Sequence, residues 1–157
     1  MDWCLNDPDS PVAYLAFDAG GDLEALSSSL KGKRVSFVTC AATPVTLPEE
    51  LEIAVHPELE YVLYDVGERV ICVAKDQLPG VLAECRAEHL IIREVKLSGQ
   101  AEPVPGAVMA DPTRILAYAS GADLVGLPCR HPRSGRISAV VADERVALEP
   151  GTGLRLR

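Results

Sequence analysis

Hydrophobic positions in the first forty residues predict two strands with one helix between them. Residues 12–17 and 35–39 are apolar runs rich in β-branched and aromatic side chains, which is typical of buried strands. Between these runs, Leu23, Leu26 and Leu30 recur at the spacing of one face of a helix. The chain therefore opens with a predicted β-α-β unit.

A second pattern follows after an acidic stretch that contains several prolines. Residues 61–64 and 69–74 are apolar runs that flank a predicted hairpin turn at residues 65–68. Apolar positions three and four residues apart then predict a helix over residues 78–89, and residues 90–97 are typical of another strand. These elements extend the predicted order to β-α-β-β-α-β.

The last third of the chain has weaker periodicity. Residues 98–106 contain two prolines and two glycines and are a candidate internal linker. Asp111 and Pro112 are suited to begin a helix, and Gly121 is suited to end it. Strands are predicted after this helix, at residues 124–127, 137–142 and 145–148.

Together these elements predict an α/β or α+β fold with a mixed β-sheet and about three helices. The first 97 residues are compatible with a ferredoxin-like β-α-β-β-α-β order, and the C-terminal strands are expected to be antiparallel. Residues 1–11 hold several turn formers and are predicted to be an N-terminal extension. Residues 12–157 then form a single α/β domain.

Composition narrows the class of protein. The chain is 48% hydrophobic and 24% charged, proportions that are typical of globular domains. Its 15 basic and 23 acidic residues give a net charge of −8, which argues against general nucleic-acid binding through phosphate contacts. No apolar run approaches the ~20 residues of a membrane helix. The five cysteines include no Cys-x-x-Cys pair, so we expect a reducing, cytoplasmic location and no membrane association.

The C-terminal part differs in charge from the rest and contains the most distinctive local motif. Its seven basic residues after position 100 are all arginine. Guanidinium groups suit forked contacts with carboxylates or phosphates. The predicted anion-binding residues fall in one short segment and are Arg130, His131, Arg133, Ser134 and Arg136.

Cysteine chemistry supplies an alternative function. Cys129 precedes the arginine-rich segment, and Cys40 follows Thr39 at the end of a predicted strand, where open α/β sheets often bind ligands. Thr39 and Cys40 are both candidate nucleophiles at that strand end, and Cys129 is another. For either thiol, the arginines would serve as an oxyanion or phosphate clamp. No histidine lies near Cys40 in sequence, and no complete catalytic motif is present.

A zinc site is a second alternative. Cys85 and His89 lie four residues apart on the predicted second helix, and Cys129 and His131 lie in a later loop. Two thiolates and two imidazoles form a donor set that suits tetrahedral zinc. Core packing of Cys85 and His89 explains the same positions without a metal.

The sequence thus favours a small cytoplasmic binding protein that serves as a regulatory or assembly module, rather than an enzyme. Its expected partner is a small anionic ligand or an acidic protein surface, and no cofactor is predicted. Edge strands of a mixed sheet need covering, which makes the chain a candidate homo-oligomer. The cysteine enzyme and the zinc-stabilised module remain open.

Overall fold

The fold was determined from a computed structural model of the chain. The structure describes residue 5 and residues 12–19, 28–30, 32–42, 52–67, 69–84, 91–97, 100–109, 112–132, 134–146 and 152–156.

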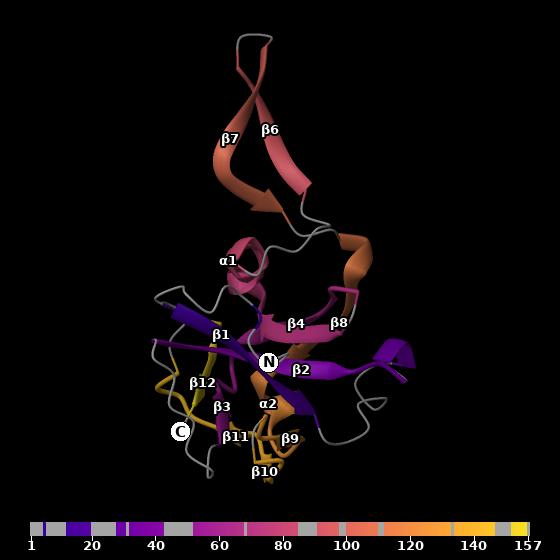
Figure 1. Ribbon diagram of the computed structural model, residues 1–157, viewed down its shortest axis with the longest axis vertical. Coiled ribbons are helices and arrows are strands. Elements are labelled where there is room, and N and C mark those ends of the chain that lie inside the picture. Colours follow the sequence, from indigo (N-terminus) through magenta and orange to yellow (C-terminus); the bar gives the residue numbers. More distant parts are fainter. Residues whose placement is uncertain are drawn as a thin grey trace.

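A seven-stranded sheet forms the centre of the described structure (Figure 1). Only β2 and β5 run parallel to each other in this sheet, and the other neighbouring pairs are antiparallel. In spatial order the strands are β10 (Ile137–Ala139), β9 (Pro128–Arg130), β1 (Val12–Ala19), β2 (Val35–Ala42), β5 (Val70–Ala74), β4 (Glu60–Asp65) and β8 (Ile115–Ser120).

Two smaller sheets and a few short helices complete the described elements. One sheet consists of β11 (Val141–Ala142), β3 (Ile53–Val55) and β12 (Leu154–Leu156), and the other of β6 (Ile91–Leu97) and β7 (Gln100–Met109). The β6–β7 hairpin extends away from the other sheets (Figure 1). The helices are η1 (Ser28–Leu30), η2 (Lys75–Gln77), α1 (Leu78–Glu84), η3 (Pro112–Arg114) and α2 (Gly121–Leu124).

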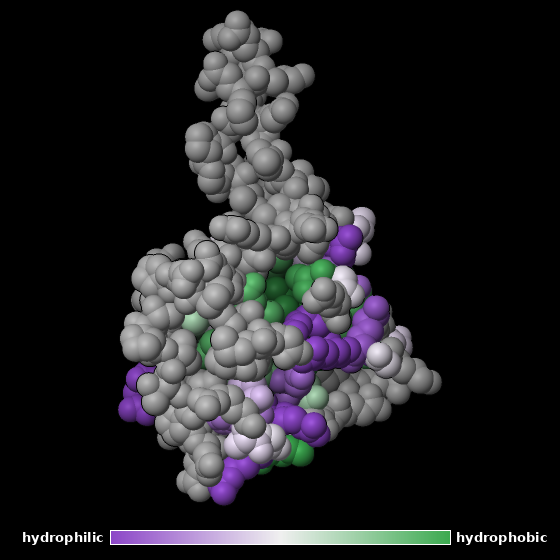
Figure 2. All heavy atoms as spheres, in the orientation of Figure 1, coloured by the Kyte–Doolittle hydropathy of each residue, from purple (hydrophilic) through white to green (hydrophobic). Residues whose placement is uncertain are grey.

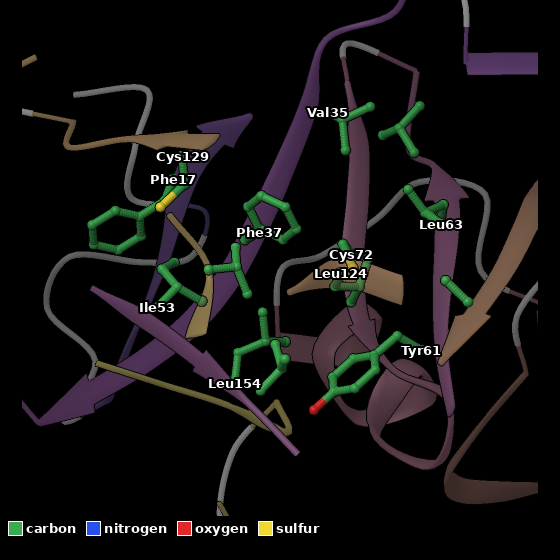
Figure 3. Packing of buried hydrophobic residues seen from close by; sticks show 14 of the residues in the cluster. Phe17, Val35, Phe37, Ile53, Tyr61, Leu63, Cys72, Leu124, Cys129 and Leu154 are labelled. Carbon is green, nitrogen blue, oxygen red and sulfur yellow. The ribbon is translucent and has the colours of Figure 1, made fainter. Parts of the chain in front are cut away.

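Both faces of the seven-stranded sheet are buried in its central strands. In β4, Tyr61 and Leu63 belong to the larger core cluster, whereas Val62 and Tyr64 belong to a second cluster. The larger cluster also contains residues of β3 and β12, so it fills the space between the seven-stranded sheet and the β11–β3–β12 sheet (Figure 3). The second cluster contains apolar side chains of α1, which covers the opposite face. Burial on both faces explains why β4 and β5 are continuous apolar runs.

Several predictions from the sequence are confirmed. The two strands near residues 12 and 35 and the hairpin of β4 and β5 are present, and the sheet is mixed. The ferredoxin-like order is not confirmed, because β1 and β2 are direct antiparallel neighbours. A ferredoxin-like β-α-β unit would join two parallel strands. Of the helix predicted around residue 26, the described part is the single turn η1.

Predictions for the second half of the chain are less accurate. The helix predicted from Asp111 to Gly121 is wrong, because residues 115–120 form β8 and pair with β4. Residues 100–109 form β7, so much of the predicted linker at residues 98–106 has regular structure. The predicted strand at residues 124–127 is wrong, since α2 ends there and a turn follows. The strand at residues 137–142 is divided between β10 and β11, which belong to different sheets.

Apolar side chains at short spacing explain these errors. The positions of Ile115, Leu116 and Ala119 fit a helix face, yet β4 offers this segment a partner strand. Long-range pairing therefore overrides the local pattern. Among the described residues, no helix is long and apolar enough to cross a membrane.

Candidate functional site

The parallel pair β2–β5 of the large sheet separates at its carboxyl end. The pairing of β2 with β5 runs from Val35 opposite Val70 to Phe37 opposite Cys72. The backbone N–H of Val70 donates to the carbonyl of Arg34, at the amino end of the ladder. Alternate residues of a strand point their N–H groups to the same side, so the N–H of Ala74 also faces β2.

A segment from the C-terminal part of the chain takes the place of β2 at this point. The N–H of Ala74 donates to the carbonyl of Thr152 at 2.8 Å. Gly153 adopts a φ of +79°, and a Cβ atom at this position would overlap the Cβ atom of Ala74. The Thr152–Gly153 segment therefore lies against the end of β5, where only glycine permits so close an approach.

Thr39 lies on β2 at the same end, and its hydroxyl is completely buried. Its spacing from Val35 and Phe37 puts it on the face of β2 that packs into the larger core cluster. The strand β12 packs against β2. Thr39 is completely buried, and its Oγ1 has no hydrogen-bond partner among the described residues. A buried hydroxyl without a partner is costly, so this atom is the candidate contact for a ligand at this end of the sheet.

The phenol of Tyr61 joins this end of the sheet to the Thr152–Gly153 segment. Its hydroxyl donates to the carbonyl of Gly153 at 2.6 Å and accepts from the backbone N–H of His56 at 3.0 Å. Burial raises the pKa of Tyr61 to about 12, so the hydroxyl stays protonated near neutral pH. Figure 3 shows Tyr61 and Leu154 within the packed core.

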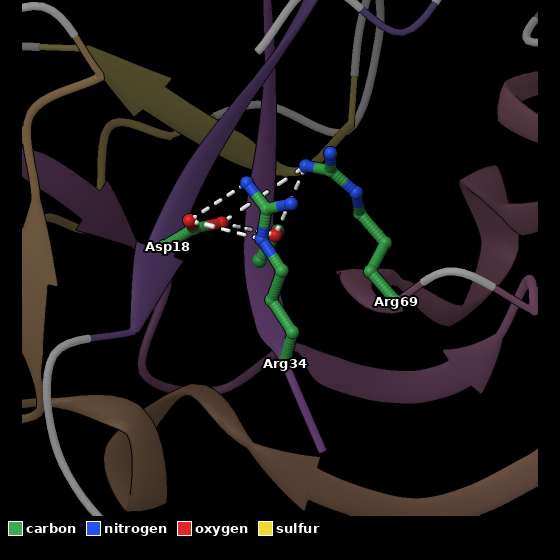
Figure 4. A network of polar contacts seen from close by, with 4 residues as sticks. Asp18, Arg34 and Arg69 are labelled. Carbon is green, nitrogen blue, oxygen red and sulfur yellow. Dashed lines mark hydrogen bonds and ion pairs between the residues drawn. The ribbon is translucent and has the colours of Figure 1, made fainter. Parts of the chain in front are cut away.

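The amino end of the same strand pair holds polar groups that have partners (Figure 4). Asp18 accepts hydrogen bonds from the Ser36 hydroxyl at 2.7 Å and from Arg34 Nε at 3.1 Å. The buried Arg69 lies 3.3 Å from Ser36 Oγ and 3.9 Å from Asp18 Oδ1. In the view of Figure 2, hydrophilic residues gather over the part of the sheet where β2 begins, beside an apolar area nearer α1. Among the described residues, the polar atoms of this network are hydrogen-bonded or ion-paired.

The arginine-rich segment forms the turn of the β9–β10 hairpin. His131 is buried, its N–H donates to the carbonyl of Arg136, and its Nδ1 accepts from the N–H of Ser134. The N–H of Arg136 donates to Ser134 Oγ at 3.3 Å. Arg130 and Arg136 are exposed, and Arg133 lies outside the described residues. These backbone amides bond within the turn, so an anion there would be held by guanidinium groups rather than by a ring of N–H groups.

The candidate nucleophilic thiols do not meet. Cys40 alternates with Thr39 along β2 and is half-buried, whereas Cys129 is buried in β9 with its Sγ 3.4 Å from Ser138 Oγ. Desolvation raises the pKa of both thiols above its ordinary value. Each side chain is therefore a protonated thiol at neutral pH, which is a poor nucleophile.

The predicted zinc ligands are described only in part. Cys85 and His89 lie outside the described residues. Cys129 and His131 have the hydrogen-bond partners given above. Within the described ranges, no group of three or more histidine, cysteine, aspartate or glutamate side chains is arranged to hold a metal ion.

The apolar pattern predicts Thr39 at a strand end, whereas no predicted site includes Tyr61, Thr152 or Gly153. Tyr61 has the pattern of an ordinary core residue in a hairpin strand. Thr152 and Gly153 belong to the short segment Gly-Thr-Gly near the C-terminus. Two glycines around one threonine signal a close backbone approach, and that was the available clue.

Comparison with curated proteins finds similarity to isoleucine--tRNA ligases. The chain is 33% identical over 147 residues to the enzyme of Geobacter sulfurreducens, which covers 94% of this chain and 13% of the relative. It is also 33% identical over 147 residues to the enzyme of Moorella thermoacetica, which covers 92% of this chain and 13% of that relative. The chain thus spans about one eighth of the length of these relatives. No family model matches the chain.

Solved structures show the same fold in leucyl-tRNA synthetases. The structure of GlLeuRS-CP1 superposes with a TM-score of 0.64 at 16% identity, covering 92% of this chain and 53% of that chain. The editing domain of the P. knowlesi cytosolic leucyl-tRNA synthetase gives a TM-score of 0.61 at 14% identity, covering 91% of this chain and 56% of that chain. The mixed α/β fold with few helices therefore resembles that of the leucyl-tRNA synthetase editing domains.

These similarities overturn two predictions from the sequence. The expected small regulatory or assembly module is wrong, because the relatives are tRNA ligases and the solved structures are editing domains, which point to a tRNA-related enzymatic function. The expected partners, a small anionic ligand or an acidic protein surface without nucleic acid, are wrong for the same reason. Net charge misled because it averages over the whole surface, whereas a binding site depends on local groups.

Proposed function

We propose that the chain is an editing domain that hydrolyses the ester bond between an amino acid and tRNA. Three observations support this proposal: the similarity to isoleucine--tRNA ligases along the chain, the fold shared with leucyl-tRNA synthetase editing domains, and the buried hydroxyl of Thr39. The proposal depends most on the Thr39 hydroxyl, because the other two observations concern similar proteins and this one concerns the chain itself.

The place of Thr39 in the sheet supports a ligand site. Ligands of α/β sheets bind at the carboxyl ends of parallel strands, especially where neighbouring strands part. β2 and β5 part here, and Thr152 occupies the position that β2 leaves. A substrate carbonyl, amine or water beside Thr39 would satisfy a group that otherwise costs about 1–3 kcal/mol to bury.

Ester hydrolysis needs a water molecule and stabilisation of the oxygen that becomes negative. The water oxygen forms a bond to the acyl carbon, the bond to the ribose oxygen breaks, and that oxygen takes the proton that water loses. The products are a free amino acid and tRNA. Thr39 Oγ1 would donate to the acyl oxygen as its charge grows. The raised pKa values of Cys40 and Cys129 favour water over a thiolate as the nucleophile.

Such hydrolysis serves amino acids that one binding step discriminates poorly. A single methylene changes binding by only about 1–3 kcal/mol, so a synthetase for isoleucine accepts some valine and needs a second site to remove it. Because the relatives are isoleucine--tRNA ligases, we propose isoleucine tRNA charged with valine as the substrate.

The test measures the release of valine by the purified chain from isoleucine tRNA that has been charged with valine. Thr39→Val keeps the shape of the side chain but removes the hydroxyl, and we expect kcat/KM to fall by about 100-fold, as when one oxyanion donor is lost. Thr39→Ser keeps the hydroxyl and should stay within a few-fold of wild type. Thr113→Val, on the exposed turn η3, makes the same change away from the site and should have no effect.

Two results would refute the proposal. One is a wild-type rate equal to spontaneous hydrolysis in buffer with both valyl- and isoleucyl-tRNA. The other is a wild-type rate above that background that Thr39→Val leaves unchanged.

A further inference from the structure

Tyr61 connects three segments that are distant in sequence. It lies on β4, and its hydroxyl contacts the carbonyl of Gly153 before β12 and the N–H of His56 after β3. The side chain is completely buried, so no bulk water competes for these bonds. The 2.6 Å bond to Gly153 lies at the short end of the range for hydroxyl donors.

The carbonyl that Tyr61 holds belongs to the Thr152–Gly153 segment, which lies against the end of β5. Gly153 follows Thr152, whose carbonyl accepts from Ala74 at the end of β5. Gly153 cannot move toward Ala74, because the two residues are already in close contact. Tyr61 lies on the neighbouring strand β4, directly opposite Ala74 in the β4–β5 ladder. Its hydroxyl therefore binds Gly153 from the strand next to the one that Gly153 contacts. The two contacts together fix the Thr152–Gly153 segment.

We propose that Tyr61 is a positioning residue that holds the Thr152–Gly153 segment at the correct place beside Thr39 for hydrolysis. This inference rests on the proposed function for its kinetic part. Its structural part, the restraint that the Tyr61 hydroxyl adds to the segment, is independent of any activity.

A direct catalytic role for Tyr61 does not fit its contacts. The hydroxyl proton is donated to Gly153, and the oxygen accepts from His56, so both partners belong to the protein. Burial raises the pKa of the phenol to about 12, far above the range in which a hydrolase would be assayed. Tyr61 therefore neither gains nor loses a proton during turnover, and it acts through the backbone that it holds.

The experiment compares Tyr61→Phe with Tyr64→Phe. Both tyrosines are completely buried on β4, but Tyr64 lies on the opposite face, in the cluster with α1. The substitution keeps the ring in each case and removes only the hydroxyl. Tyr64→Phe is thus a matched control for loss of a buried hydroxyl away from the site.

Amide hydrogen exchange provides the first measurement. In β5, the Ala74 amide bonds to Thr152, whereas the Val70 amide bonds to Arg34 at the other end of the strand. We expect Tyr61→Phe to accelerate exchange of Ala74 at least 10-fold more than that of Val70. Tyr64→Phe should not accelerate Ala74 relative to Val70.

Kinetics of valyl-tRNA hydrolysis provide the second measurement. We expect Tyr61→Phe to lower kcat about 10-fold with KM within two-fold of wild type, because the segment is displaced while substrate binding elsewhere is retained. The shape of the pH profile should not change. Tyr64→Phe should retain the wild-type kcat.

Each outcome decides between the two proposals. An unaltered difference between Ala74 and Val70 in Tyr61→Phe overturns the inference, and so does selective exchange with a wild-type kcat. A wild-type chain without hydrolysis overturns the proposed function, yet the exchange measurement still tests the restraint. If Tyr61→Phe does not fold, 3-fluorotyrosine at position 61 replaces it. This analogue is a stronger donor and should slow exchange of Ala74 only, and unchanged exchange would contradict the inference.

Discussion

The two ends of the β2–β5 pair treat buried polar groups in opposite ways. At the amino end, the Ser36 hydroxyl donates to Asp18 and lies within reach of Arg69. At the carboxyl end, Thr39 has no partner among the described residues. Both side chains are completely buried on one strand, three residues apart. We infer that the Ser36 hydroxyl contributes to the stability of the fold, whereas the Thr39 hydroxyl does not and has a different role.

The backbone also differs between these two ends of the β2–β5 pair. At the amino end the strands pair regularly, and Val70 bonds to Arg34 of β2. At the carboxyl end Thr152 replaces β2, and Gly153 adopts a positive φ against Ala74. Buried polar atoms without a partner are rare in folded proteins and often mark a functional site. Only the carboxyl end shows such an atom among the described residues.

The largest expected effect comes from adding one carbon to Gly153. Gly153→Ala should destabilise the chain by about 3 kcal/mol, because the new Cβ would overlap Ala74 and the residue must keep a positive φ. Gly135→Ala is the control. Gly135 has a similar φ of +74° but open space around it, so only the backbone term remains, about 1 kcal/mol. Urea unfolding of the two variants measures the difference, and equal costs would mean that the contact with Ala74 is not tight.

At the opposite end, Asp18→Asn should cost about 2 kcal/mol. The substitution removes the charge that Arg34, Ser36 and Arg69 share, and hydrogen bonds to charged groups are worth more than neutral ones. The carboxylate is one-third exposed, which limits the loss below that of a fully buried pair. Glu60→Gln is the comparison, since its 3.6 Å ion pair with Lys75 is exposed and should be worth less than about 1 kcal/mol. A loss for Asp18→Asn no larger than that of Glu60→Gln in chemical denaturation would show that the network contributes little.

The central strands could be predicted from the sequence because their consecutive residues are apolar, as expected for strands buried on both faces. Val70 to Ala74 are all buried, and that continuous run is unambiguous. Residues 115–120 carry a pattern that fits either a helix face or an edge strand, and the choice depends on β4, more than fifty residues away. Local periodicity contains no information about such a partner.

The candidate site was predictable only in the part that is local. Thr39 ends an apolar strand, which is a recognised position for ligand contacts. The Thr152–Gly153 segment reaches the end of β5 only when the whole chain is folded, so its place could not be predicted locally. Tyr61 differs from an ordinary core tyrosine only in the hydrogen bond of its hydroxyl to Gly153. The arginine-rich segment attracted attention by composition, although its backbone amides serve a hairpin turn.

The smallest expected effect is also the one that tests the comparison most directly. Ser36→Ala breaks a hydrogen bond to a carboxylate and should cost about 1.5 kcal/mol. Thr39→Val removes a hydroxyl that has no partner in the described ranges and fills the same space with a methyl group, so it should leave stability unchanged or raise it by about 0.5–1 kcal/mol. Unfolding free energies of the two variants give the answer. A loss for Thr39→Val equal to that of Ser36→Ala would mean that the hydroxyl has a structural partner, and the two ends of the strand pair would then be alike. A gain in stability combined with a loss of hydrolysis would instead identify Thr39 as a residue whose hydroxyl serves the substrate at the expense of the fold.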